Sequence, residues 1–448
     1  MKTDIRGVPV TGADTLALLR YETALNQFQS YTGDSIATID EAIAAAPAFT
    51  AAHLFKALVL YTVAERRFVP MAAASLQDAK RDAARANPRE RGLIAAAEKL
   101  IGGDWHGASQ ALDRVLAEFP RDAFTVQIAH LMDFFRGDAL NLRNRISRVL
   151  PEWDASVPGY SYVLGMHAFG LEEMNQYPEA EATARRALAM QPRDGWAVHA
   201  TVHVMERQGR SDEGIDFLVS REPEWAPDNG FAFHNFWHLA LFHMDAGRHD
   251  RALALYDASI HPEPATYLLS LVDATALLWR LALQGVDVGN RFERVADDWQ
   301  ARLAEEPGFY AFNDAHAAMA FAATRRDSEL MRLTLAMREA AADGNANAAM
   351  TRDVGLPLVE GLTAFGRGRY AEAIAAIEPM RDTANRFGGS HAQRDLITLT
   401  LIEAALRSGD RMRARHYIAE RLVHKPDSAW GPRLLQRANA VAGLSAAA

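Results

Sequence analysis

Residues 103–120 of this chain read GDWHGASQALDRVLAEFP. A small residue, Ala108, is followed by Leu112 and Val115 at helical spacing, and Pro120 ends the stretch. Apolar residues three and four apart lie on one face of a helix, and small residues on that face let a second helix approach closely. The same offsets recur after residues 175–177 and, almost unchanged, after residues 409–411, at Ala180, Ala184, Ala187 and Pro192 and at Ala414, Ile418 and Pro426. The pattern predicts repeated pairs of helices joined by a turn.

The residues that reverse the chain recur at a nearly constant interval. Five turn positions are separated by 34, 38, 34 and 38 residues, and they are Gly103, Gly137, Asn175, Gly209 and Gly247. A weaker unit turns at Gly368. A helix-turn-helix unit of this length resembles the tetratricopeptide repeat. We therefore expect an all-α superhelix of stacked tetratricopeptide-like repeats, that is, an alpha-alpha solenoid.

The array is expected to form one domain over residues 1–448. Regular repeats are predicted over about residues 90–260, divergent repeats over 261–360 and C-terminal repeats over 361–440. Breaks in the helical pattern are expected at residues 222–230, 261–266 and 341–357. None of these segments has the low-complexity composition of a flexible linker.

Composition narrows the class of protein. Of the 448 residues 49% are hydrophobic and 23% are charged, which excludes wholesale disorder. The net charge of -9 argues against a nucleic-acid partner, and the absence of cysteine excludes disulfides and thiolate metal sites. With neither a secretory signal nor an apolar stretch that could span a membrane, we expect a soluble, cytoplasmic protein without a membrane partner.

Several longer strings are more specific than the repeat itself. They are residues 194–199 (DGWAVH) with His203 and Glu206, 234–238 (HNFWH), 312–316 (FNDAH), 352–357 (RDVGLP), and 388–390 (GGS) with 392–395 (AQRD). With these strings the chain resembles the tetratricopeptide repeat protein 38 family from about Glu90 onward, and again at residues 45–49. The resemblance implies a helical-repeat fold and no particular activity, substrate or site.

Four histidines form two pairs with the same spacing. His199 and His203 are four residues apart on one expected helix, and His234 and His238 are four apart on the first helix of the next unit. Residues four apart lie on one face of a helix, and Glu206 shares the face of the first pair. With Gly209 and Gly247 as turn position 15, the histidines occupy positions 5 and 9 in one unit and 2 and 6 in the next. In tetratricopeptide repeats these positions line a concave groove, so the pairs are expected to face a common cavity.

Three interpretations of this cluster stay open. All four imidazoles could bind a divalent metal, namely Zn²⁺, or Fe²⁺ or Mn²⁺ if a carboxylate joins them. Without a metal, the histidines could serve as general acid and base, because histidine titrates near neutrality. They could also form a buried structural network. No organic cofactor is implied.

Further polar residues in the specific strings are candidates for substrate contact. They are Asn235, Asn313, Asp314, His316, Arg352, Arg394 and Asp395. Either arginine could bind a carboxylate or phosphate with two hydrogen bonds, or form an ion pair between helices. Asn or Asp at a helix start could instead cap it. Asp273 and Arg280, seven residues apart on one expected helix, are expected to pair with each other.

The leading functional hypothesis is an enzyme or enzyme-like binder of a small polar substrate, with acid-base or metal-dependent hydrolytic chemistry. Its catalytic residues would be His199, His203, Glu206, His234 and His238, and iron would favour oxygen chemistry instead. The nucleotide-binding loops, the nucleophile elbow and the HExxH zinc motif are absent from the sequence. The alternative is a non-catalytic scaffold that binds a peptide or protein partner in its groove.

Overall fold

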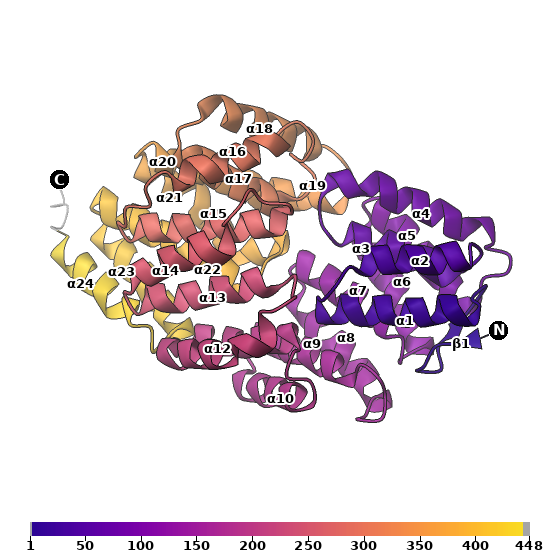
Figure 1. Ribbon diagram of the computed structural model, residues 1–448. Coiled ribbons are helices and arrows are strands. Elements are labelled where there is room, and N and C mark those ends of the chain that lie inside the picture. The colour runs from indigo at the N-terminus through magenta and orange to yellow at the C-terminus, as the bar shows by residue number, and fades with distance from the viewer. Residues whose placement is uncertain (1, 442–448) are drawn as a thin grey trace. The chain divides into compact units, whose positions relative to one another are not determined.

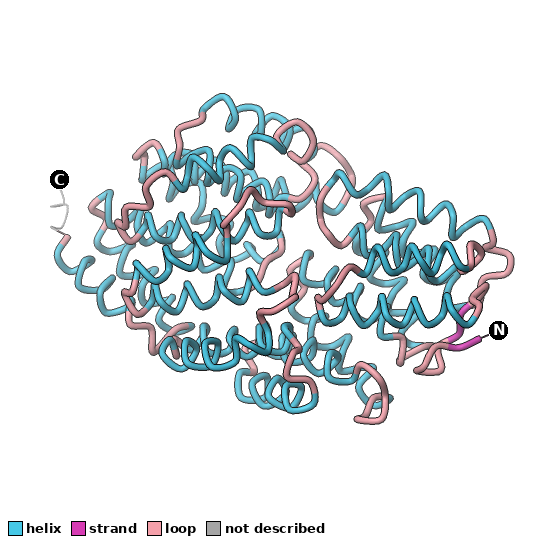
Figure 2. Tube along the Cα trace, viewed as in Figure 1, coloured by secondary structure: helices cyan, strands magenta, loops and turns pink. Residues whose placement is uncertain are grey.

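The computed structural model describes residues 2–441. Figure 2 shows that nearly all regular structure in this range is helical. The described strands are β1 (Lys2–Thr3) and β2 (Pro9–Val10), which pair antiparallel with Lys2 opposite Val10. The predicted all-α class is confirmed. No helix within residues 2–441 is long and apolar enough to cross a membrane.

The helices belong to two compact units. Unit 1 comprises residues 1–201 and 222–232, and unit 2 comprises residues 202–221 and 233–448. Each unit is a stack of helical hairpins, labelled in Figure 1. The prediction of one continuous domain stays a prediction.

Unit 1 contains α1 to α10 and shares α11 and α12 with unit 2. The bounds are α1 Thr15–Ser30, α2 Ser35–Ala45, α3 Thr50–Tyr61, α4 Val69–Arg81, α5 Pro88–Ile101, α6 Trp105–Glu118, α7 Ala123–Phe135, α8 Ala139–Val149, α9 Tyr160–Glu173, α10 Tyr177–Met190, α11 Gly195–Gln208 and α12 Ser211–Trp225. Sequential helices pack as hairpins, for example α5 with α6 and α9 with α10. Short 3-10 turns at Arg66–Phe68 and Leu150–Glu152 complete the unit.

Unit 2 continues with α13 to α24. The bounds are α13 Ala232–Asp245, α14 His249–Leu255, α15 Leu268–Leu283, α16 Arg291–Arg302, α17 Ala311–Ala323, α18 Asp327–Ala340, α19 Ala346–Met350, α20 Leu356–Gly366, α21 Tyr370–Ile377, α22 His391–Ser408, α23 Arg411–His424 and α24 Trp430–Ala440. Single π turns extend α14 through Tyr256–Ile260 and join α19 to α20 through Thr351–Gly355, and a 3-10 segment spans Glu378–Phe387.

The predicted turns are confirmed by the backbone. All six predicted turn residues have a positive φ, between 60° and 82°, a conformation that glycine adopts without steric cost. Two of these glycines, Gly103 and Gly137, precede an aspartate, as does Gly409, which also has a positive φ. Asp104, Asp138 and Asp410 each accept a hydrogen bond from the backbone N–H three residues later. The Gly-Asp pair therefore ends one helix and caps the next.

The predicted break at residues 341–357 is only partly correct. The chain leaves regular structure at residues 341–345, and then runs as helix through α19, the π turn and α20. Asn345 caps this run by accepting from the Ala348 N–H, so the loop-like composition hides a helix start. The break at residues 261–267 matches the prediction, whereas the one predicted at 222–230 begins only at residue 226, because α12 continues to Trp225.

Asp194 makes the stability of unit 1 depend on pH. Its carboxylate is buried and accepts from the N–H groups of Trp196 and Ala197, so that it begins α11. Burial raises the pKa of Asp194 to about 7. Because the folded chain then holds a proton that the unfolded chain has released, the contribution of Asp194 to stability falls as the pH rises from about 4 to about 7.

We expect Asp194→Asn to remove this dependence. The free energy of unfolding of the variant minus that of the wild type should be about 3 kcal/mol larger at pH 8 than at pH 4.5. Native-state hydrogen exchange of the α9 and α10 amides measures this locally in unit 1. An equal difference between the two proteins at both pH values would show that Asp194 is ionised in the folded chain.

Candidate functional site

Three of the four predicted histidines come together within unit 2. His203 is on α11, and His234 and His238 are on α13, and all three side chains are buried. The ring centroids lie 4.6 Å apart for His203 and His238, and 4.9 Å apart for His234 and His238. One nitrogen of each ring lies within 4.8 Å of one nitrogen of each of the other two rings. The spacing therefore predicted correctly that α11 and α13 bring imidazoles together.

The fourth histidine, His199, lies one turn earlier on α11 and belongs to unit 1. It is buried there, with ring centroids 5.3 Å from Phe169 and 5.0 Å from Trp196. Trp196 and Phe169 also contact each other. His199 thus packs within an aromatic cluster of unit 1.

A buried carboxylate on α15 fixes one histidine of unit 2. A hydrogen bond of 2.6 Å joins His234 Nδ1 to Asp273 Oδ2, and both side chains are buried. The expected pairing of Asp273 with Arg280 is wrong, because Arg280 donates instead to the carbonyl oxygens of Ala392 and Gln393. Burial raises the pKa of Asp273, although His234 opposes the shift. The contact between His234 and Asp273 orients the imidazole.

His238 is uncharged at neutral pH. Burial and the neighbouring His203 and His234 hold the pKa of His238 well below its usual range. The ring of Trp237 stacks on His234, with centroids 5.2 Å apart, and the guanidinium of Arg280 lies 5.3 Å from the centroid of Trp237. The imidazoles therefore sit among aromatic rings away from bulk water.

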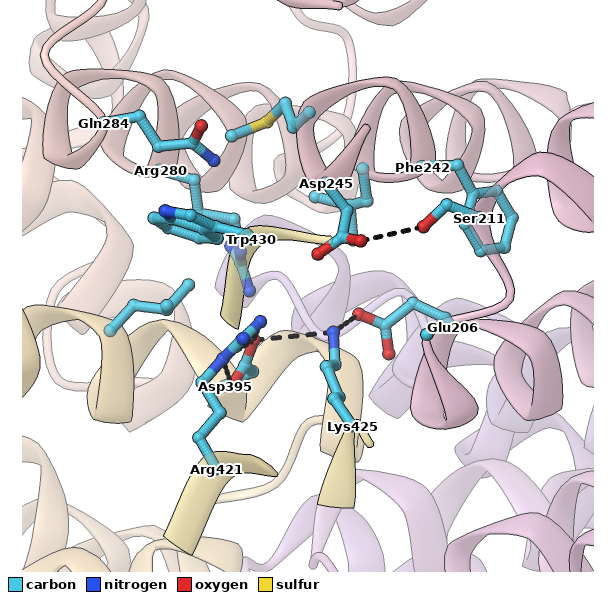
Figure 3. A pocket seen from close by; sticks show the side chains of 14 residues that line it. Glu206, Ser211, Phe242, Asp245, Arg280, Gln284, Asp395, Arg421, Lys425 and Trp430 are labelled. Atoms are coloured by element: carbon cyan, nitrogen blue, oxygen red, sulfur yellow. Dashed lines mark hydrogen bonds and ion pairs between the residues drawn. The ribbon is translucent and has the colours of Figure 1, made fainter. Parts of the chain in front are cut away.

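A chain of buried ion pairs lies next to the histidines and is drawn in Figure 3. Glu206 on α11 pairs with Lys425 just after α23, Lys425 Nζ is 3.5 Å from Asp395, and Arg421 donates to both oxygens of Asp395 at 2.9 Å. We call Glu206, Asp395, Arg421 and Lys425 the charged cluster. Burial would raise the pKa of Asp395, but Arg421 and Lys425 hold it well below its usual range.

The charged cluster lines a small cavity within unit 2. The cavity measures about 30 Å³ and is also lined by Arg280, Gln284 and Trp430. A volume of this size accommodates about one water molecule. Glu206, the predicted general base, lines this cavity and pairs with Lys425.

The other predicted contact residues have structural partners. Asp314 accepts from the Gly308 N–H, and His316 Nδ1 contacts the Phe312 carbonyl oxygen at 2.8 Å, with burial lowering the pKa of His316 to about 4. Arg394 donates to the Gly389 carbonyl, and Arg352 is exposed and donates to the Ala341 carbonyl. Asn235 is fully buried, while Asn313 is only partly buried on the first turn of α17. Their proposed contact with a ligand stays a prediction.

Side-chain packing explains why some residues occur in the specific strings. Gly389 has φ +75°, and a Cβ atom there would lie 2.4 Å from the ring of Phe312. Phe312 also contacts Phe387, with ring centroids 5.2 Å apart. The strings at residues 312–316 and 388–390 thus meet each other, and only glycine leaves room for the aromatic ring.

A larger cavity than the one beside the charged cluster is a groove that sequence analysis did not predict. It has a volume of about 640 Å³ and is lined by residues of α18 on one side and of α20 and α21 on the other. Buried Leu330 and Val359 line it, and Met331 and Leu335 of α18 are 69% and 59% exposed beside it. The signal available in the sequence was a pair of apolar residues four apart, Met331 and Leu335, within the segment predicted to hold divergent repeats.

The charges around this groove neutralise one another. Three ion pairs lie among its lining residues, Arg367 with Asp327 at 2.7 Å, Arg338 with Glu360 at 3.4 Å, and Arg369 with Glu372 at 2.7 Å. The groove therefore combines an apolar interior with a rim of zero net charge.

Comparison with known proteins gives similar structures at low identity. No protein-family model matches the chain. The APC/C hetero-tetramer Cut9–Hcn1 is 12% identical with a TM-score of 0.46, covering 94% of this chain and 76% of that one. The human IFIT1 dimer with m7Gppp-AAAA is 13% identical with a TM-score of 0.44, covering 96% and 95%. A tetratricopeptide repeat protein from Parabacteroides merdae is 13% identical with a TM-score of 0.34, covering 60% and 98%.

These findings correct the functional hypothesis. These comparisons do not support the expected hydrolytic enzyme and agree better with the scaffold alternative, because the similar structures contain Hcn1 or m7Gppp-AAAA. The expected small-molecule substrate is corrected by the same comparison. In fold, the chain is an all-α solenoid of tetratricopeptide-like helical hairpins.

Proposed function

We propose that this chain is a non-catalytic scaffold that binds an amphipathic helix of a partner protein. The binding site is the groove between α18 and the α20–α21 hairpin. The observation that carries the proposal is the exposure of Met331 and Leu335 beside an apolar groove of about 640 Å³. Grooves of this kind receive helices whose apolar side chains recur every three or four residues.

The chemistry of the rim favours a helix over other occupants. Since the three arginines around the groove are matched by Asp327, Glu360 and Glu372, it offers no surplus of positive charge to a phosphate backbone. A helix with two or three apolar anchors and polar flanks would bury Met331 and Leu335 without leaving a charge unpaired.

Site-specific cross-linking tests this function. A photo-reactive amino acid at position 335 of the full chain should cross-link one segment of one protein in cells of the source organism. The same amino acid at position 423 is the matched control, because Val423 is also exposed, at 78%, and lies on α23. The cross-linked segment, made as a peptide, should bind the purified chain. Equal cross-linking at both positions, or cross-links only to nucleic acid at position 335, would overturn the proposal.

We further infer that the chain is a divergent member of the tetratricopeptide repeat protein 38 family and works in the cytoplasm. The strings at residues 194–199, 234–238 and 312–316 support the family, and the absence of cysteine is compatible with the compartment.

A further inference from the structure

We propose that His203, His234 and His238 bind one divalent transition-metal ion, with Zn²⁺ the preferred ion. The site would join α11 to α13 within unit 2. It is independent of the partner-binding groove, which α18, α20 and α21 form.

The geometry of the three rings suits a metal. Zn²⁺ binds imidazole nitrogens at about 2.0–2.1 Å, so two ligand nitrogens of a tetrahedral site are roughly 3.3 Å apart. The nitrogens of these three histidines already lie within 4.8 Å of one another. Modest side-chain rotations would bring them to ligand distance, since His234 and His238 share a helix and the rings of His203 and His238 are in contact.

A carboxylate already holds one ligand in the orientation that a metal requires. Asp273 contacts His234 Nδ1 at 2.6 Å, which assigns metal ligation to Nε2. Carboxylates that bind the second nitrogen of a metal-ligating histidine fix its tautomer and increase its basicity. Asp273 also brings a negative charge next to the proposed cation.

The nearby positive charges have carboxylates close to them. Lys425 and Arg280 are close to His238, but Lys425 pairs with Glu206, and the carboxylate of Asp395 lies close to Arg280. A dication among the imidazoles would therefore meet the field of Asp273, with Lys425 neutralised by Glu206 and Arg280 sharing Asp395 with Arg421. Nitrogen ligands of this number and type favour Zn²⁺ over Mg²⁺ or Ca²⁺.

Zn²⁺ titration of the full chain tests the site. Protein without a polyhistidine tag is stripped with chelator and titrated with Zn²⁺ at pH 7.5 by calorimetry, and Co²⁺ absorption reports the coordination geometry. We expect one ion per chain with a Kd below about 1 μM and the visible bands of tetrahedral Co²⁺. His203→Ala and His238→Ala should each weaken binding at least 100-fold. Asp273→Asn should weaken it by about 10- to 100-fold and keep the Co²⁺ bands.

His243→Ala is the matched control, because His243 is on the same helix, is half-buried and is outside the cluster. It should bind Zn²⁺ as the wild type does. Wild-type protein with native helical circular dichroism and no binding tighter than about 10 μM would overturn the proposal, as would unchanged binding in folded His203→Ala and His238→Ala. His238→Gln is a second variant should His238→Ala not fold. Substitutions in the groove should leave Zn²⁺ binding unchanged, so the metal site and the scaffold function can fail separately.

Discussion

Asp395→Ala is expected to lower the free energy of unfolding of unit 2 by about 3–5 kcal/mol. Asp395 accepts three hydrogen bonds from Arg421 and lies 3.5 Å from Lys425, and all three side chains are buried. Removing the carboxylate leaves the Arg421 charge without its partner away from water. The penalty for that uncompensated charge is much larger than the net strength of the pair itself.

Chemical denaturation, monitored by hydrogen exchange of the amides in α22 and α23, measures this loss of stability. Glu360→Ala is the control, because the ion pair of Glu360 with Arg338 is exposed and should contribute less than about 1 kcal/mol. In the wild type, the stabilisation that Asp395 provides should also decrease in acid. A carboxylate whose pKa is lowered on folding stabilises the folded chain fully above its unfolded pKa, and progressively less as the pH falls below that value. Equal effects of the two substitutions would contradict the role of Asp395.

The double substitution Met331→Asp and Leu335→Asp is expected to weaken binding of the partner helix at least about 100-fold. Each apolar side chain contributes about 1.5–3 kcal/mol when it is fully buried. A carboxylate in its place would also lose water on binding. Because both positions are exposed in the chain alone, the variant should fold as stably as the wild type.

Met412→Asp with Val423→Asp is the matched control for this variant. Both residues are 78% exposed on α23, outside the groove. Calorimetry with the peptide that cross-linking identified should give the wild-type affinity for the control variant and a lower affinity only for the groove variant. A similar loss in both variants would indicate a general effect of added negative charge.

The repeat pattern predicted the fold because the determinants are local. A glycine followed by an aspartate specifies both the end of one helix and the start of the next, as Gly103 with Asp104 and Gly409 with Asp410 show. The composition of residues 341–357 was misleading, because Asn345 starts a helix there. Local pattern cannot reveal a helix that depends on packing for its stability.

Helical spacing predicted which site residues share a helix face, and it could not predict the rest of the candidate site. Spacing placed His234 and His238 on one face of α13, and they do lie together with His203. The residues that contact these side chains come from distant parts of the sequence: Asp273 is 39 residues from His234, and Lys425 is 219 residues from Glu206. Those contacts depend on how hairpins stack, and no local pattern in one sequence encodes that.

The measurement that tests the scaffold account most directly is hydrogen–deuterium exchange of the full chain with and without the partner peptide. The account predicts that bound peptide slows exchange in α18, α20 and α21, where the groove residues lie. Slowing confined to α22 and α23 or to the helices of unit 1, with residues 327–377 unchanged, would contradict it.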